Sequence, residues 1–270
     1  MTSPHGPGAE AGRVRWRRYV AVGDSTTEGM DDPDGAGGYR GWADRFAEHV
    51  DRAQGGGLEY ANLAVRGRTT AAIRAEQLLP ALALEPDLVT VVSGMNDLLR
   101  PSFDLRGVVR DLHVMQAAFV HEGATVLSFT LPDLSPVLPL ARPLDGRLRA
   151  LNDGIRRACE RSGARLLDLA AHPVASDPRL WSEDRLHANS AGHERIADAL
   201  AHRLGLPGAR DDWTEPLPPA PARRRSELAA AELAWARTHL GPWLYRRLRG
   251  RSSGDGVSAK RPVPRPVSPR

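Results

Sequence analysis

The 270-residue sequence contains a single cysteine, Cys159, so no disulfide can form within the chain. None of its apolar runs approaches the about 18 residues that a membrane-spanning helix needs. Residues 1–18 also lack the apolar stretch of a secretory signal peptide. We therefore expect a cytoplasmic protein that folds without disulfides or a transmembrane anchor.

The net positive charge of the chain is confined to its end. The net charge is +4, but residues 246–270 hold eight basic residues and one acidic residue, which is +7. The other 245 residues therefore carry a net charge of −3. The sequence pI of 9.8 thus reflects the tail, and the body has no basic excess that would indicate nucleic-acid binding.

Apolar segments and helical periodicity alternate along the chain. Near-continuous apolar runs predict strands buried on both faces of a parallel sheet, at residues 18–22, 58–63, 87–93, 124–130 and 164–169. Amphipathic patterns predict helices at residues 38–52, 69–80, 104–121, 145–161 and 190–203. A strand followed by a helix, five times over, predicts a doubly wound α/β domain.

The chain around this domain differs in composition. The domain is expected to span residues 15–206, after a Gly-, Pro- and Ala-rich N-terminus of residues 1–14 that we expect to be disordered. A Pro-rich linker of residues 207–226 and a helix of residues 227–249 follow it. Residues 250–270 are rich in Ser, Gly, Pro and Arg and are predicted to form a disordered basic tail.

Four polar motifs follow predicted strands or precede a helix. In an open α/β sheet, functional residues gather at the carboxyl ends of the strands. The motifs are Gly23-Asp24-Ser25, a loop ending in Gly67, Gly94-Met95-Asn96-Asp97, and Asp184-Arg185-Leu186-His187. HExxH, Walker A and paired CxxC motifs are absent, so the sequence supports neither a metal site nor a nucleotide site.

Together the four motifs supply the groups that acyl transfer needs. The hydroxyl of Ser25 is a weak nucleophile and needs a base, for which His187 is suited. Asp184, three residues before His187, could orient the imidazole and stabilise its charged form. The N–H groups of Ser25 and Gly67 and the amide of Asn96 could donate to a tetrahedral oxyanion.

The four motifs resemble, in order, the signature blocks of the GDSL, or SGNH, hydrolase family over about residues 18–205. The resemblance implies a flavodoxin-like three-layer α/β/α sandwich with a five-stranded parallel sheet in the order 2-1-3-4-5, followed here by a C-terminal helical extension. It implies that Ser25 is the nucleophile, His187 the base and Asp184 the orienting acid. It also implies that Gly67 and Asn96 form the oxyanion hole. The chain departs from the family name in having Thr26 in place of leucine.

The expected activity is hydrolysis of a carboxylic ester through an acyl-enzyme, with no metal or cofactor. A small-molecule acyl ester is the expected substrate, and no nucleic-acid partner is expected. A thioesterase or lysophospholipase of the same mechanism is an alternative. So is a catalytically inactive relative that binds a polyanion or a membrane surface through its basic tail.

Other polar residues near these motifs have simpler interpretations. Asp24 is expected to brace its turn, and Asp97 to hold the loop that presents Asn96. His172 is interpreted as a loop residue, and His193 as a solvated or capping residue of a helix. Cys159 is expected to be a small core residue.

The helix after His187 suggests a further hypothesis. Asn189 or Ser190 is expected to cap that helix. The positive end of the helix would then keep His187 neutral and ready to accept a proton.

The predicted C-terminal helix carries a stripe of large apolar residues. Three interpretations are open: the stripe lines an acyl pocket, packs on the body or touches a membrane. Burial against the body is the commonest of these. The stripe consists of Trp235, Leu240, Trp243, Leu244 and Tyr245.

Overall fold

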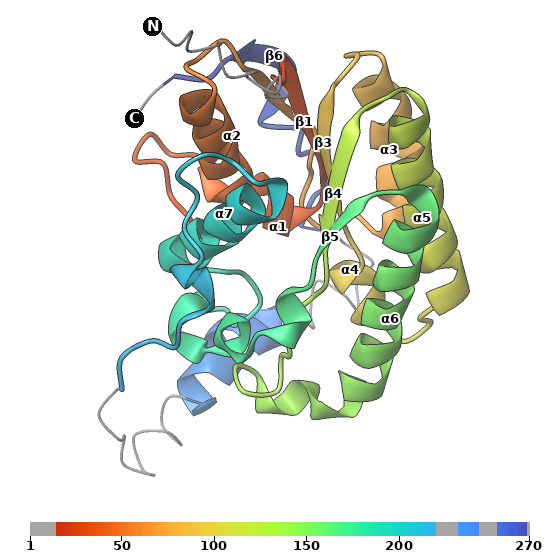
Figure 1. The fold of residues 1–270 in the computed structure, drawn as a ribbon. Coiled ribbons are helices and arrows are strands. Elements are labelled where there is room, and N and C mark those ends of the chain that lie inside the picture. The colour runs from red at the N-terminus through yellow and green to blue at the C-terminus, as the bar shows by residue number, and fades with distance from the viewer. Residues whose placement is uncertain (1–14, 220–231, 243–252, 269–270) are drawn as a thin grey trace, which may run out of the picture.

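A mostly parallel sheet of six strands lies at the centre of the protein, with helices on both faces (Figure 1). The computed structural model describes residues 15–219, 232–242 and 253–268, and the predicted N-terminal disorder over residues 1–14 lies outside them. The strands are β1 (Arg18–Gly23), β2 (Glu59–Asn62), β3 (Leu88–Val92), β4 (Thr125–Phe129), β5 (Arg165–Leu167) and β6 (Arg261–Pro266). Their order is β5-β4-β3-β1-β2-β6, so the predicted α/β sandwich and the order of its first five strands are confirmed.

The helices form two layers. Helices α3 (Thr70–Leu82), α5 (Leu105–His121) and α6 (Asp145–Ser162) cover one face, and α2 (Gly41–Ala53) and α7 (Ser190–Leu204) cover the other (Figure 1). Two four-residue helices that the sequence does not predict, α1 (Ser25–Glu28) and α4 (Met95–Leu98), follow β1 and β3 directly. Short 3-10 turns lie in the later loops: η1 (Pro139–Leu144), η2 (Leu169–Ala171), η3 (Pro173–Ser176), η4 (Pro178–Leu180) and η5 (Asp212–Thr214).

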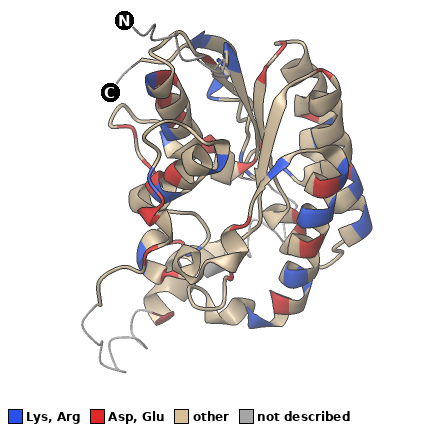
Figure 2. Ribbon diagram, in the orientation of Figure 1, with Lys and Arg blue, Asp and Glu red and all other residues tan. Residues whose placement is uncertain are grey.

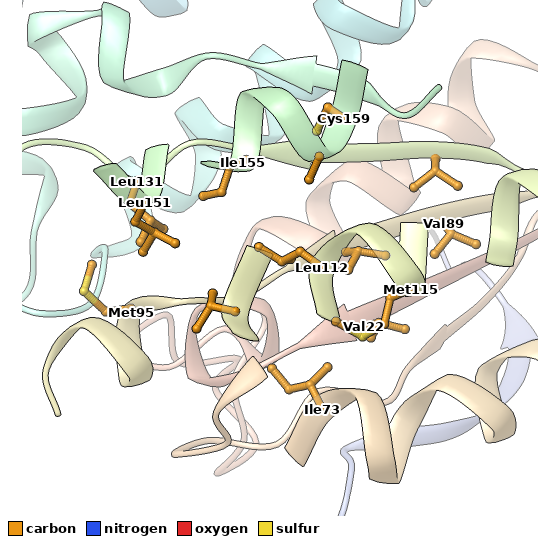
Figure 3. Close-up of a cluster of buried hydrophobic side chains, with 14 of the residues drawn as sticks. Val22, Ile73, Val89, Met95, Leu112, Met115, Leu131, Leu151, Ile155 and Cys159 are labelled. Atoms are coloured by element: carbon orange, nitrogen blue, oxygen red, sulfur yellow. The ribbon is translucent and has the colours of Figure 1, made fainter. Parts of the chain in front are cut away.

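Alternate residues of each strand point to opposite faces, which gives the sheet one apolar cluster on either side. Val20 and Val22 of β1 face α3, α5 and α6, whereas Tyr19 and Ala21 face α2 and α7. Figure 3 shows the first cluster, in which Cys159 lies among core residues as expected. Burial raises the pKa of the Cys159 thiol to about 11, which suits a core residue. The strongly charged surfaces of α5 and α6 face outward (Figure 2).

The sixth strand corrects the prediction that residues 250–270 form a disordered tail. β6 pairs antiparallel with β2 and so covers what would otherwise be an edge strand. Its three prolines occupy alternate positions, and the N–H of Val267, two residues after Arg265, donates to the carbonyl of Leu58. The missing N–H groups of the prolines therefore face away from β2, where a strand tolerates them. The sheet has six strands instead of the five predicted.

Parts of the predicted linker and C-terminal helix are also described. Trp213, within the predicted linker, is buried in the core beneath α7. Residues 232–242 are helical, and Ala236–Leu240 form a π-helical turn, η6. The remainder of the predicted helix over residues 227–249 lies outside the described residues. Within the described ranges, no helix combines the length and apolarity needed to cross a membrane.

Candidate active site

The turn that carries Ser25, residues 23–29, is here called the serine turn. β1 ends at Gly23, whose N–H donates to the Gln77 side chain at 2.9 Å and whose carbonyl accepts from it at 2.9 Å. A side chain at Gly23 would place its Cβ 2.7 Å from the carbonyl oxygen of Val92, so the close approach to β3 requires glycine. Asp24 caps α1 by accepting from the N–H of Thr26, which confirms its predicted bracing role.

Ser25, His187 and Asp184 form a continuous hydrogen-bonded array. The Ser25 Oγ lies 2.8 Å from His187 Nε2, and His187 Nδ1 lies 2.6 Å from Asp184 Oδ2. Ser25 and His187 are buried, each with 8% of its surface exposed. The fold therefore joins two motifs that are 162 residues apart in sequence.

His187 belongs to an irregular segment between η4 and α7, residues 182–187, here called the histidine loop. Asp184 Oδ1 accepts from the N–H groups of Leu186 at 2.9 Å and His187 at 3.0 Å. The Ser182 N–H donates to the His187 carbonyl at 2.8 Å, which closes the loop on itself. Asn189 then caps α7 by accepting from the N–H of Gly192, which is one of the two caps expected. The Asp184 carboxylate is thus fixed by the same loop that carries His187.

The electrostatics of this array correct one expectation. Burial favours the neutral form of the Asp184 carboxyl, but its hydrogen bond and ion pair with His187 outweigh burial and lower its pKa. Burial also favours neutral His187, but Asp184 and the nearby charges of Asp31 and Asp24 raise the pKa of His187 above its usual 6.5. The hypothesis that the α7 N-terminus holds His187 neutral is therefore wrong, because the net shift of the His187 pKa is upward.

Asn96 lies beside the serine turn. Its Nδ2 donates to Asp24 Oδ2 at 3.2 Å and to the carbonyl of Arg68 at 3.1 Å. Burial raises the pKa of the Asp24 carboxyl to about 6, despite hydrogen bonds from Thr26 and Asn96. Asn96 therefore connects the turn after β1 with the loop after β2.

Gly67 lies in that second loop, residues 63–69, here called the glycine loop. Its φ of 74° falls in the left-handed region that glycine adopts without strain. The preceding Arg66 pairs with Glu28 of the serine turn, through both its N–H and its guanidinium. Asp97 Oδ2 accepts from the N–H and the hydroxyl of Thr70, each at 2.9 Å. Asp97 therefore anchors the start of α3, next to the glycine loop, as well as the turn that carries Asn96.

Two other histidines that the sequence analysis considered, His193 and His172, have roles outside the array. His193 is fully buried: its Nδ1 accepts from the N–H of Trp42 at 3.1 Å, and its Nε2 lies 3.0 Å from the Met30 carbonyl. Burial lowers its pKa to about 4, so the expectation of a solvated residue is wrong, whereas its bond to Trp42 in the first turn of α2 is a capping contact. His172 packs edge-on against Trp213, with ring centroids 4.6 Å apart. The contacts of both residues are structural.

Two residues that contact the array, Asp31 and Ser182, belong to none of the four motifs, so the sequence does not indicate their role. Asp31 Oδ2 lies 3.9 Å from His187 Nδ1 and 2.5 Å from the Ser182 hydroxyl. Ser182 Oγ also lies 2.6 Å from Asp184 Oδ1, so its single proton serves one of two carboxylates. Asp31, Asp184 and His187 have potential ligand atoms within 4.8 Å of one another. A cation there would compete with the hydrogen bond between His187 and Asp184.

Two apolar cavities lie on either side of Leu186 of the histidine loop. The inner cavity has a volume of about 70 Å³, and its lining includes Thr26, the residue after Ser25. The rest of its lining is largely apolar and includes Met95, Leu131 and Trp181. The outer groove, of about 420 Å³, lies between η1 and residues 232–242. Its lining includes Leu99, Leu138, Leu144, Asp184 and Trp235. Of the three interpretations of the C-terminal stripe, packing on the body therefore holds for Trp235, which is buried and also lines this groove.

The sheet and its two helical layers define the protein as a doubly wound α/β protein, with the polar motifs gathered at the carboxyl edge of the sheet. The sequence profile of the GDSL-like Lipase/Acylhydrolase family matches residues 21–195, and the chain belongs to this family.

Three relatives illustrate the similarity. The GDSL lipase Rv0518 of Mycobacterium tuberculosis is 28% identical over 205 residues, which cover 71% of this chain and 83% of that protein. A catalytic mutant of Axe2, an acetylxylan esterase from Geobacillus stearothermophilus, has a TM-score of 0.60 at 16% identity and covers 72% of this chain and 97% of its own. The psychrotrophic esterase EstA from Pseudoalteromonas sp. has a TM-score of 0.56 at 17% identity, with coverages of 70% and 97%. At these identities the solved structures show that the fold is shared.

Proposed function

We propose that the protein hydrolyses carboxylic esters, with Ser25 as nucleophile, His187 as general base and Asp184 as the group that orients it. The observation that carries this proposal is the array of 2.8 Å and 2.6 Å contacts from the Ser25 hydroxyl through the imidazole to the Asp184 carboxylate. In this geometry Nε2 can take the hydroxyl proton while Nδ1 remains bound to Asp184. Three solved structures of Axe2 are described as catalytic mutants, and in them a serine, an aspartate or a histidine is replaced by alanine. The aspartate and the histidine are three residues apart in Axe2, as Asp184 and His187 are in this chain.

The reaction has two halves. Ser25 Oγ attacks the ester carbonyl as its proton moves to His187 Nε2, and the resulting tetrahedral intermediate expels the alcohol, which takes that proton. Water then attacks the acyl-enzyme, gives a proton to His187 and displaces Ser25, which recovers the proton as the carboxylic acid leaves. The proton on His187 is stabilised throughout by Asp184, consistent with the raised pKa of the imidazole.

The oxyanion is stabilised by the N–H groups of Ser25 and Gly67 and by the Asn96 amide. The Asn96 Nδ2 already donates to Asp24 and to the Arg68 carbonyl, so the oxyanion shares one of these two protons. The bond to Asp24 keeps the amide directed toward the serine turn. Contacts between Glu28 and Arg66 hold the residue before Gly67 against the same turn. Donors fixed in this way before substrate arrives need little reorganisation during the reaction.

A series of nitrophenyl esters from acetate to dodecanoate, with one acyl thioester added, tests the proposal. The wild-type protein should hydrolyse at least one of them, and Ser25→Ala should reduce kcat to the background rate. Ser128→Ala is the matched control, because Ser128 is also buried and its hydroxyl donates to the Val91 carbonyl within the sheet. Preference for the thioester would favour the thioesterase alternative. A folded wild type without turnover, or an active Ser25→Ala variant, would refute the proposal.

A further inference from the structure

The histidine loop contains a strained residue, Arg185, between Asp184 and His187. Arg185 adopts a φ of 61°, in the left-handed region, which is unfavourable for a residue with a side chain. Within the described ranges, only Asp31, Glu85 and Arg185 combine a side chain with positive φ. Asp31 Oδ2 lies 3.9 Å from His187 Nδ1, and Arg185 lies two residues before His187 in the sequence. Such a backbone conformation persists only where surrounding contacts hold it.

The side-chain contacts of Arg185 come from the C-terminal segment, defined here as residues 232–242, whereas its backbone N–H donates to the Ser182 carbonyl within the loop at 3.1 Å. The Arg185 guanidinium lies 4.9 Å from the centroid of the Trp235 ring, and its Nη1 pairs with Glu232 at 2.7 Å and 2.8 Å. Over the described part of the chain, these are the polar and ring contacts of that side chain. Residues almost fifty positions downstream therefore contact the side chain of the strained residue.

Trp235 also contacts the backbone of the loop directly. Its indole Nε1 donates to the carbonyl oxygen of Asp184 at 3.2 Å, and its side chain is buried, with 8% of the residue exposed. This carbonyl belongs to the peptide group between Asp184 and Arg185. The hydrogen bond therefore restrains the orientation of the Asp184 backbone, from which the carboxylate extends to His187 Nδ1.

The polypeptide beyond this segment is anchored to the body. Lys260 Nζ lies 2.5 Å from Asp44 Oδ2 and 2.9 Å from the Tyr39 carbonyl, and β6 then joins the sheet beside β2. At Gly254 the chain passes so near the glycine loop that a Cβ would lie 2.0 Å from the Arg66 carbonyl. The described C-terminal residues are thus packed against the body on both sides of the candidate site.

We propose that Trp235 is a positioning residue, which fixes the peptide between Asp184 and Arg185 so that the Asp184 carboxylate remains aligned with His187. This inference rests on the proposed function of Ser25, His187 and Asp184. Trp235 touches none of the reacting atoms and acts through the backbone of the histidine loop. Its loss should therefore lower kcat much more than it changes KM for a short ester.

The test uses Trp235→Phe and Trp235→Ala in the full chain, with Trp16→Phe as the matched control. Trp16 is buried to the same extent, with 8% exposed. It precedes β1 and so lies at the amino end of the parallel strands, whereas the site lies at their carboxyl end. Trp235→Phe keeps an aromatic ring under Arg185 but loses the hydrogen bond, so kcat should fall about three- to tenfold. Trp235→Ala should lower kcat further, and Trp16→Phe should leave it unchanged.

A second readout does not depend on turnover. Titration of His187 by NMR should give a lower pKa in Trp235→Ala than in the wild type, because a misaligned Asp184 stabilises the imidazolium less. If the wild type hydrolyses esters while both kcat and the His187 pKa are unaffected by the Trp235 variants, the positioning role is wrong. If the His187 pKa falls but the wild type hydrolyses no ester, the proposed function fails while the positioning role stands.

Discussion

The serine turn and the histidine loop reach the same site by different means. The serine turn continues directly from β1 in the middle of the sheet, and Gln77 and the neighbouring β3 fix its backbone. The histidine loop lies outside any strand or helix longer than one turn, and its conformation includes a non-glycine residue at positive φ. Its supports are backbone hydrogen bonds within the loop itself and side-chain contacts, some of them from the far end of the chain.

The difference indicates where each half of the site is vulnerable. Backbone hydrogen bonds of the sheet hold the serine turn, so a lost side chain there should reduce stability before it reduces rate. The histidine loop is held by hydrogen bonds within itself and by side chains rather than by the sheet, so lost side-chain contacts should reduce rate first. The predictions below test each half, in order of decreasing effect.

The largest effect is expected at Asp184, the centre of the histidine loop. Asp184→Asn should lower kcat by about 10⁴-fold, the loss seen when a triad aspartate becomes an amide that favours the wrong imidazole tautomer. Steady-state kinetics on the best nitrophenyl ester would measure it. A loss of less than tenfold would mean that Asp184 does not orient His187.

Asn96 should show the next largest effect. Asn96→Ala removes one oxyanion donor and should lower kcat by about 10²–10³-fold. The comparison is Asn152→Ala, since Asn152 is a buried amide that exchanges two hydrogen bonds with the backbone of Leu131. The control should lose stability and retain most of its rate. Equal rate losses in the two variants would argue against an oxyanion role for Asn96.

Gln77 tests the strand-held half. Gln77→Ala removes both hydrogen bonds to Gly23 and should lower the free energy of unfolding by about 1–3 kcal/mol. Its kcat should change only a few-fold, because the ladder with β3 still holds the end of β1. Urea unfolding and kinetics on one preparation would measure both. A loss of kcat greater than that of Trp235→Ala would overturn the contrast between the two halves.

The smallest effect is a shift in pH dependence. Because the pKa of His187 is raised and the reaction needs the neutral imidazole, kcat/KM should rise with pH and reach half its maximum above pH 6.5. Asp31→Asn removes a carboxylate 3.9 Å from Nδ1, which stabilises the imidazolium. The half-maximum should therefore move to lower pH, by up to about one unit. A pH–rate profile that is unchanged or displaced upward would contradict this assignment.

Much of the fold could be predicted because its signals are local. The apolar runs predict each of the first five strands with boundaries that differ by at most two residues, and the four polar motifs fall at the carboxyl edge of the sheet. The sequence does not predict β6, because its alternating prolines are typical of a segment that cannot join a sheet. Only the pairing with β2 shows that the prolines occupy positions that a strand tolerates. The burial of His193 similarly depends on α2 and the loop carrying Met30, which no local pattern specifies.

The supports of the site were less predictable than its central residues. Ser25, Asp184 and His187 lie in recognisable motifs, whereas Asp31, Ser182 and Trp235 contact them only after the chain has folded. The pKa of His187 shows the same limit. The following helix suggested a lowered value, but the carboxylate of Asp31, which is distant in sequence, adds to that of Asp184 and raises it.

The most direct test of the account is covalent labelling with a fluorophosphonate, followed by peptide mapping by mass spectrometry. The account predicts one modified residue, Ser25, in the wild-type protein, and strongly slowed labelling in His187→Ala. Modification of another serine, or labelling at an undiminished rate without His187, would contradict it.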